Sequence, residues 1–245
     1  MFVGYHLEAV DTGRTLEVRM AIEGEGHRKS ADEIAEAYKS EPWWYDVRGF
    51  FILTFAYNST LPQQIRLFGS NMGAKHLDVA CGTATLLDLI IKWRRWKKLP
   101  EVDIVGVDYA ESMLAGAIRR FNGQPRFRFV HADAADMPFE GNAFDTVNIA
   151  NAIHCLPQVN AALLEMVRVL RPGGTFAANV LLYPQGKGVL AGFANRINAW
   201  GVKKGILVTP YDREDIRDRI IKSGLHITRE EVSGNCYNVV AMKPV

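Results

Sequence analysis

The feature that most constrains the fold is a regular alternation of short apolar runs with longer amphipathic stretches, which begins near residue 76. Apolar runs of about 4 to 8 residues are typical of strands, and apolar residues three and four apart are typical of helices. The pattern predicts strands at 76–80, 103–108, 127–130, 144–150, 175–182, 226–232 and 237–242, and helices at 84–96, 111–121, 159–170 and 213–223. Strands that alternate with helices form βαβ units. We therefore expect an α/β fold, doubly wound, with a mostly parallel seven-stranded sheet.

The remainder of the chain is expected to be a cap on this sheet rather than a second domain. Ser30 followed by Glu33 has the spacing of a capping box, which predicts an N-terminal helical cap. We expect a single domain over residues 30–245, with cap elements at 30–70 and 183–211. Residues 1–29 lack a clear pattern and are expected to form an arm. Met20 would serve as an alternative start, so whether residues 1–19 belong to the native protein stays open.

Composition argues against several classes of protein. The 245 residues carry 29 basic and 27 acidic side chains, a net charge of +2, which disfavours a strongly basic nucleic-acid coat. Three cysteines without paired spacing favour a reducing compartment, so we expect a cytoplasmic protein. No Cys/His cluster suggests a metal site. No uncharged apolar run approaches the roughly 18 residues that a membrane span needs.

One basic run, Lys92 to Lys98, invites a nucleic-acid or membrane interpretation. The helix predicted at 84–96 starts at a strand-end loop, so its C-terminal end should lie at the opposite edge of the sheet from a ligand cleft. Cations at that end complement the helix dipole. We therefore expect a solvated helix end with Trp93 and Trp96 packing down, and neither nucleic acid nor membrane as a partner.

The loops that follow the strands are the candidate site. In open parallel sheets ligands bind beyond the carboxyl ends of the strands, which directs attention to residues 80–85, 108–113, 131–137 and 150–156. The first loop is Ala-Cys-Gly-Thr-Ala-Thr, a small-residue turn that lets the backbone approach a ligand closely. It lacks the GxGxxG spacing of dinucleotide-binding loops and the lysine of phosphate-binding loops.

The stretch at 77–87 resembles motif I of class I S-adenosylmethionine (SAM)-dependent methyltransferases, usually written LDxGCGTG. Matching residues are Asp78, Cys81, Gly82 and Thr83, whereas alanine replaces the usual glycine at Ala80 and Ala84. Alanine fits wherever φ stays negative, so these two departures are compatible with binding. The resemblance implies a Rossmann-like fold, SAM as cofactor, S-adenosylhomocysteine as product and no metal. It assigns cofactor contacts to Asp78, Ala80, Cys81 and Gly82.

Three further segments agree with this family in order and spacing. Residues 107–114 resemble VDxSxxML, residues 132–139 resemble GDAxxLPF, and residues 144–174 resemble FDxV…LHHL…RVLKPGG. The family's roles then pass to this chain as ribose binding by Asp108 and adenine recognition by Asp133 and the Ala134 N–H, and we expect neighbouring cofactor contacts from Tyr109 and Met113. Asn151 is expected either to contact SAM or the substrate, or to form hydrogen bonds within its own loop. Four segments in this order make the resemblance specific.

Two residues are candidates for a role in catalysis. His154 occupies a strand-end position that faces the cleft in related methyltransferases, where it would act as a base or orient the substrate. A histidine of ordinary pKa near 6.5 suits that task at neutral pH. Tyr45 matches a Tyr-Asp pair in the first helix of the family, where the tyrosine reaches toward the SAM carboxylate or the substrate.

Substrate selection is expected in the cap, which is rich in aromatic residues. Aromatic walls suit a planar aromatic or heteroaromatic molecule; the residues predicted to contact it are Trp43, Trp44, Tyr183 and Tyr211. Packing in the core is the competing interpretation for each of them.

The sequence therefore predicts a SAM-dependent methyltransferase that acts on a small planar molecule at N or O, as in secondary-metabolite or toxin biosynthesis. A toxoflavin-type azapteridine N-methyltransferase is one specific hypothesis, and a quinone-biosynthesis C-methyltransferase is a close competitor. An NAD-dependent oxidoreductase and a non-catalytic methyltransferase-like binding protein are the alternatives from other classes. The sequence does not address the oligomeric state.

Overall fold

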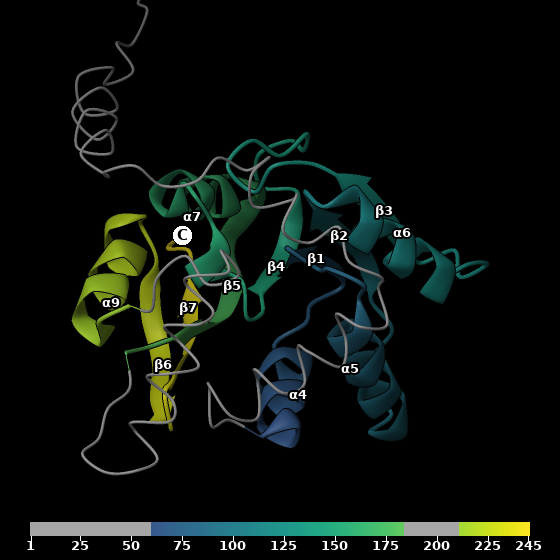
Figure 1. The fold of residues 1–245 in the computed structure, drawn as a ribbon, viewed down its shortest axis with the longest axis horizontal. Helices are drawn as coiled ribbons and strands as arrows, with labels where there is room; N and C mark the ends of the chain where they lie inside the picture. The colour runs from purple at the N-terminus through teal and green to yellow at the C-terminus, as the bar shows by residue number, and fades with distance from the viewer. Residues whose placement is uncertain (1–59, 184–210) are drawn as a thin grey trace, which may run out of the picture.

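The computed structural model describes residues 60–183 and 211–245. The predicted alternation of strands and helices is confirmed, with most boundaries within one or two residues of those predicted (Figure 1). In chain order the elements are α4 (Leu61–Ser70), β1 (Lys75–Val79), α5 (Thr85–Trp96), β2 (Asp103–Asp108), α6 (Glu111–Arg120), β3 (Phe127–His131), β4 (Phe144–Ile149), the short 3₁₀-helix η2 (Ile153–Cys155), α7 (Val159–Val169), β5 (Leu170–Leu181), α9 (Arg213–Lys222), β6 (His226–Ser233) and β7 (Cys236–Met242).

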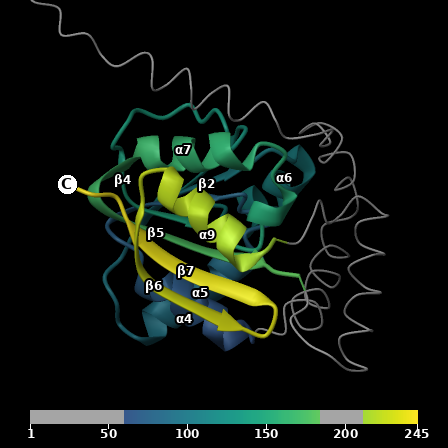
Figure 2. The ribbon, with the colours of Figure 1, turned by 90° about the vertical axis from the view of Figure 1, so that its left-hand side faces the viewer.

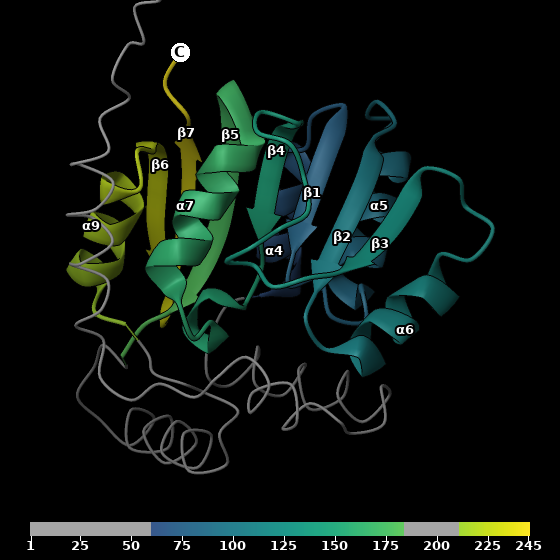
Figure 3. The same cartoon turned by 90° about the horizontal axis from the view of Figure 1, so that it is seen from above.

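The strands form one seven-stranded sheet in the order β3-β2-β1-β4-β5-β7-β6, which can be followed across Figure 3. The first five strands along the chain pair in parallel, and β7 runs antiparallel to both β5 and β6. This confirms the prediction of a mostly parallel, Rossmann-like sheet. The strand order reverses between β1 and β4, and this switch point is where such sheets bind ligands.

Two apolar cores cover the two faces of the sheet. Helices α7 and α9 pack on one face, and α4 and α5 pack on the other (Figure 2). The central strands are buried on both sides, which explains their nearly continuous apolar sequences. For example, β1 buries four of its five residues.

Strand β5 begins at Leu170, earlier than the 175 predicted from the apolar run. Gly173 adopts a φ of 71°, a conformation that favours glycine. Its N–H donates to the Lys243 carbonyl at 2.8 Å, and the Lys243 N–H donates to the Gly174 carbonyl at 3.0 Å. Pairing with the C-terminal segment therefore extends the strand through Gly173 and Gly174. Glycines are not part of an apolar run, so the sequence pattern did not include them in the strand.

The prediction that both tryptophans of the basic run pack down is wrong for Trp96. Its side chain is 72% exposed, with the Lys97 ammonium 4.4 Å from the ring centroid. Arg94 is instead buried, and its guanidinium donates to the Gly69 and Pro100 carbonyls. The arginine faces inward because the C-terminal end of α4 presents an unpaired carbonyl to it.

Of the predicted cap, only α4 lies within the described residues. Its N-terminus is fixed by a capping box between Thr60 and Gln63. Trp43, Trp44 and Tyr45 lie outside the described residues, as do the arm at 1–29 and most of the second cap element. No helix of the described part of the chain is long and apolar enough to cross a membrane.

Candidate functional site

The site is built where the carboxyl ends of the parallel strands meet. Asp108, the last residue of β2, joins the two loops on either side of it. Its carboxylate accepts a hydrogen bond from the Gly82 N–H at 2.7 Å and another from the Ala110 N–H at 2.8 Å. The loop amide that would face a phosphate in a nucleotide-binding turn is therefore occupied by a carboxylate of the protein itself.

The loop after β1 has an unusual backbone. Ala80, Gly82 and Ala84 all have positive φ, at 54°, 56° and 56°. The expectation that alanine is tolerated because φ stays negative is therefore wrong at both alanines. A Cβ at position 82 would meet no atom of the described residues within 4 Å. The loop therefore keeps the left-handed geometry that glycines usually provide, and the described elements leave space beside Gly82.

We expect glycine at both alanine positions to stabilise the protein. A left-handed conformation costs alanine about 1–2 kcal/mol, and the greater backbone entropy of glycine offsets roughly 0.5–1 kcal/mol of that. The double variant Ala80→Gly/Ala84→Gly should raise the free energy of unfolding by about 1 kcal/mol in urea titrations. Ala117→Gly, within α6, is the matched control and should lower it by a similar amount. A loss of stability in the loop variant would contradict the left-handed geometry.

Asp78 adds a second carboxylate beside Asp108. Burial, reinforced by the charge of Asp108, raises the pKa of Asp78 from 3.8 to about 7. Desolvation likewise raises the pKa of Asp108, although the N–H groups of Ala110 and Gly82 partly oppose this. Two poorly solvated carboxylates favour a cationic ligand, because a positive charge would relieve both the desolvation and the mutual repulsion.

Cys81 lies in the same loop, where its side chain packs against its neighbours. Its thiol is not activated as a nucleophile. Desolvation, followed by the charges of Asp108 and Asp78, holds the pKa of its thiol well above 9. Its sulfur lies 3.0 Å from the position that a Cβ on Gly106 would take, and Phe129 lies 2.6 Å from that position. Glycine at 106 therefore lets the loop and β3 close over β2, and Cys81 contributes packing.

Arg120 holds the far side of the loop. Its Nε donates to the Thr83 carbonyl at 3.0 Å, and its Nη2 donates to the Thr85 hydroxyl at 2.8 Å. These bonds anchor the loop and the first turn of α5 to the C-terminal end of α6. The family motifs carry no signal for Arg120, because the contact joins residues that are distant in sequence.

The loop after β3, which carries the predicted adenine residues, forms a tight turn. The Asp133 carboxylate accepts a hydrogen bond from the Ala135 N–H at 2.9 Å, and the Asp136 N–H donates one to the Asp133 carbonyl at 3.0 Å. This turn buries Ala134. Beside it, the Tyr109 ring lies 5.4 Å from the His131 ring. The predicted adenine residues are thus adjacent to the end of β2, whereas the side chain of Met113 is buried, with 2% exposed.

The loop after β4 holds the other predicted residues. Asn151 has a φ of 55°, and its side chain is engaged by Gln64 and Asn179. His154 lies in η2 and is only 4% exposed. Burial lowers the pKa of His154 to about 4, so its imidazole is neutral at pH 7 and only weakly basic. The expectation of a base with an ordinary pKa is therefore wrong, although a hydrogen-bonding role stays a prediction.

The two described tyrosines of the predicted substrate cap differ in their surroundings. Tyr183 is 43% exposed, whereas Tyr211 is 6% exposed and packs in the core that α9 covers. The backbones of the two residues meet, because the Tyr183 N–H donates to the Tyr211 carbonyl at 3.0 Å. Tyr183 therefore stands at the rim of the site, and core packing accounts for Tyr211.

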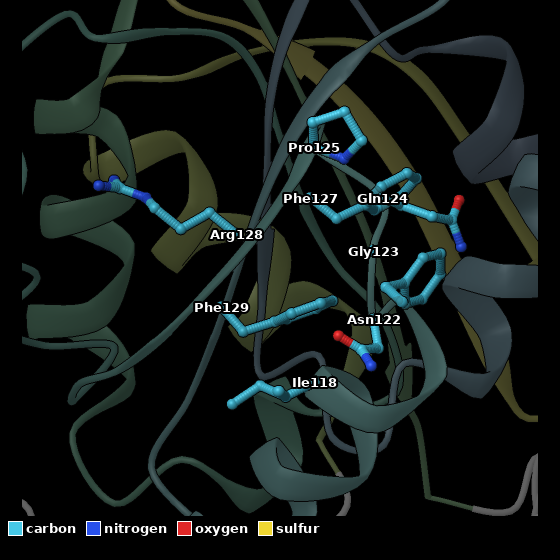
Figure 4. A pocket seen from close by; sticks show the side chains of 9 residues that line it. Ile118, Asn122, Gly123, Gln124, Pro125, Phe127, Arg128 and Phe129 are labelled. Carbon is cyan, nitrogen blue, oxygen red and sulfur yellow. The ribbon is translucent and has the colours of Figure 1, made fainter.

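The described residues also form a hollow of about 490 Å³ between the C-terminal end of α6 and β3. Phe127 and Phe129 line it together with Ile118, and the Arg128 side chain is directed away from these residues (Figure 4). The hollow lies at the start of β3, whereas Asp133 follows the other end of that strand. The hollow is therefore separate from the strand-end site.

Comparison with known proteins supports the family resemblance. Residues 77–178 match a family model described as a methyltransferase domain. This part of the chain is therefore similar to methyltransferase domains. Over 106 residues it is 37% identical to the demethylmenaquinone methyltransferase of Staphylococcus aureus strain JH9, a match that covers 43% of this chain and 42% of that protein. The chain thus spans about two fifths of the length of the curated relative it matches.

Solved structures of methyltransferases share the fold of this chain. A SAM-dependent methyltransferase from Aquifex aeolicus is 18% identical, with a TM-score of 0.58 over 88% of this chain and 100% of that chain. Phosphoethanolamine N-methyltransferase 2 of Haemonchus contortus, in complex with SAM, is 17% identical, with a TM-score of 0.60 over 75% of this chain and 53% of that chain. At these identities the likeness concerns the fold.

The described part of the chain has no cluster of metal-ligating side chains. Among residues 60–183 and 211–245, no group of three or more His, Cys, Asp or Glu side chains is placed to hold a metal ion. The acidic residues at the strand ends are instead engaged by backbone N–H groups.

Proposed function

We propose that the protein transfers a methyl group from SAM to a small, planar aromatic or heteroaromatic molecule at nitrogen or oxygen. The observation that carries this proposal is the hydrogen bond between the Gly82 N–H and the Asp108 carboxylate. A loop whose amide is already paired with a carboxylate has no place for the pyrophosphate of a dinucleotide. Such a loop suits a positively charged nucleoside that carries no phosphate.

The strand-end residues fit SAM on these grounds. Asp78 and Asp108 favour a cation. Asp108, at the end of β2, would accept hydrogen bonds from the ribose diol, and the Ala134 N–H in the Asp133 turn would meet the adenine ring. SAM supplies an activated methyl group on its sulfonium. The protein then has mainly to align donor and acceptor and to exclude water. A neutral His154 would orient the substrate by hydrogen bonding.

A quinone-biosynthesis C-methyltransferase is the second candidate, favoured by the identity to demethylmenaquinone methyltransferase. A toxoflavin-type azapteridine N-methyltransferase is the specific version of the first candidate. The remaining details of the proposal are a small-molecule substrate, no nucleic-acid or membrane partner, and a cytoplasmic location.

The test begins with the cofactor. Isothermal titration should give micromolar affinity for SAM and S-adenosylhomocysteine and none for NAD. The reverse would establish the oxidoreductase alternative, and binding of neither would favour a non-catalytic protein. Transfer of the labelled methyl group of SAM to an azapteridine, a phenolic heterocycle or a demethylated naphthoquinone, followed by mass spectrometry of the product, then separates N or O transfer from C transfer. Modification of only the quinone would overturn the first candidate.

A further inference from the structure

Three polar side chains from three elements meet at the end of β4. The Asn151 Nδ2 donates to the Gln64 Oε1 on α4 at 3.0 Å. The Asn179 Nδ2, on β5, donates to the Asn151 Oδ1 at 2.7 Å, and the Asn151 backbone N–H donates to the Asn179 Oδ1 at 2.6 Å. We refer to Gln64, Asn151 and Asn179 as the amide triad.

The amide triad holds Asn151 in a left-handed backbone conformation close to the switch point of the sheet. Asn151 has a φ of 55°, which costs energy for any residue with a side chain. It is the second residue after β4, which borders the switch point between β1 and β4. Asn179 binds both the backbone and the side chain of Asn151. The triad therefore fixes the path of residues 151–155 beside the switch point.

The burial of the triad argues against an incidental surface network. Asn179 is fully buried, and Gln64 is 1% exposed. A buried polar group without a hydrogen bond costs free energy, whereas apolar residues would fill the same space without that cost. Within residues 60–183 and 211–245, the Gln64 Nε2 of the triad and the Oδ1 of the nearby strand residue Asn148 have no hydrogen-bond partner. This polar environment is concentrated at the strand ends, where a polar ligand would bind.

We propose that Gln64 and Asn179 are positioning residues for the cofactor site, and that both act through Asn151 to hold the loop at 151–155. The inference rests on the proposed function. Of the two roles expected for Asn151, the bonds of its side-chain amide to Gln64 and Asn179 favour the one within the loop over contact with the cofactor.

The test measures SAM affinity by isothermal titration in variants that keep side-chain volume. Gln64→Met and Asn179→Leu should each weaken SAM binding about tenfold, equivalent to about 1.4 kcal/mol. Asn151→Gly keeps the left-handed conformation accessible but removes the side chain, so it should weaken binding similarly. Adding Gln64→Met to Asn151→Gly should then cause no further loss, because both act through the same bond.

The matched control is Gln63→Met, one residue earlier in α4. Gln63 is exposed and belongs to the capping box, so its loss should lower the melting temperature and leave SAM affinity unchanged. If Gln64→Met does not fold, Asn179→Leu tests the same triad from β5. Unchanged SAM affinity in the folded triad variants, or fully additive losses, would overturn the inference. Failure of the wild-type protein to bind SAM would instead overturn the proposed function on which it rests.

Discussion

Replacement of Asp108 by asparagine should weaken SAM binding by at least about 100-fold. The carboxylate accepts from both Gly82 and Ala110, and an asparagine has only one oxygen to offer. One backbone N–H would then face an NH₂ group, and the diol of the ribose would lose a charged acceptor. Hydrogen bonds to charged groups contribute about 1.5–3 kcal/mol each, so the loss of two accounts for this magnitude.

Isothermal titration with SAM and S-adenosylhomocysteine measures the effect, and calorimetry checks that the variant is folded. Asp103→Asn is the matched control, because Asp103 begins the same strand at its opposite end and only pairs with Arg126 on the surface. It should leave SAM affinity unchanged. If Asp108→Asn bound SAM as tightly as the wild type, the ribose-binding role of Asp108 would be excluded.

The second large effect is a loss of stability in mild acid caused by two buried histidines. Burial lowers the pKa of His76 to about 3, helped by the charge of Arg94, and burial lowers the pKa of His154 to about 4. Both residues titrate near 6.5 when unfolded, so the unfolded chain binds more protons below that pH. The two histidines therefore leave the free energy of unfolding unreduced above pH 6.5, and they lower it as the pH falls below 6.5. At about 1.36 kcal/mol per pKa unit, the two histidines together account for up to roughly 8 kcal/mol by pH 3.

Asp78 opposes this trend over part of the range. Its folded pKa of about 7 lies above the unfolded value, so the folded protein gains stability from Asp78 as the pH falls from 7 toward 4. Wild-type protein should therefore lose a net few kcal/mol between pH 6.5 and pH 4. Urea titrations at several pH values measure this loss. His76→Gln should flatten the decline and Asp78→Asn should steepen it. An unchanged slope in both variants would refute this account.

The sequence was sufficient to predict the sheet and the place of the site, because both depend on local patterns. The apolar runs predicted every strand of the sheet, and the motif spacing put Asp108 and Asp133 at neighbouring strand ends. It could not predict that Ala80 and Ala84 adopt positive φ, because the surrounding loop contacts override the preference of alanine. Nor could it predict the histidine pKa values, since desolvation depends on packing from elements distant in sequence.

The amide triad was missed for the same reason. Gln64, Asn151 and Asn179 are far apart in the chain and match no family motif. The available signal was an amide in the C-terminal half of each of two central strands, Asn148 in β4 and Asn179 in β5, where apolar side chains are the usual occupants. A polar residue in a central strand, when both faces are covered, indicates a partner from another element.

The junction at Tyr183 and Tyr211 has a consequence for how specificity can diverge. Leu182 and Tyr211 form a β-bridge, and the Tyr211 N–H donates to the Leu181 carbonyl at 3.0 Å. The chain therefore leaves the sheet and returns to it at adjacent points, whatever residues 184–210 contain. Doubling the length of such an excursion costs only about 0.6 kcal/mol of closure entropy. This connection allows relatives to exchange or lengthen the sequence between these two points while the strands, and the residues at their ends, remain unaltered.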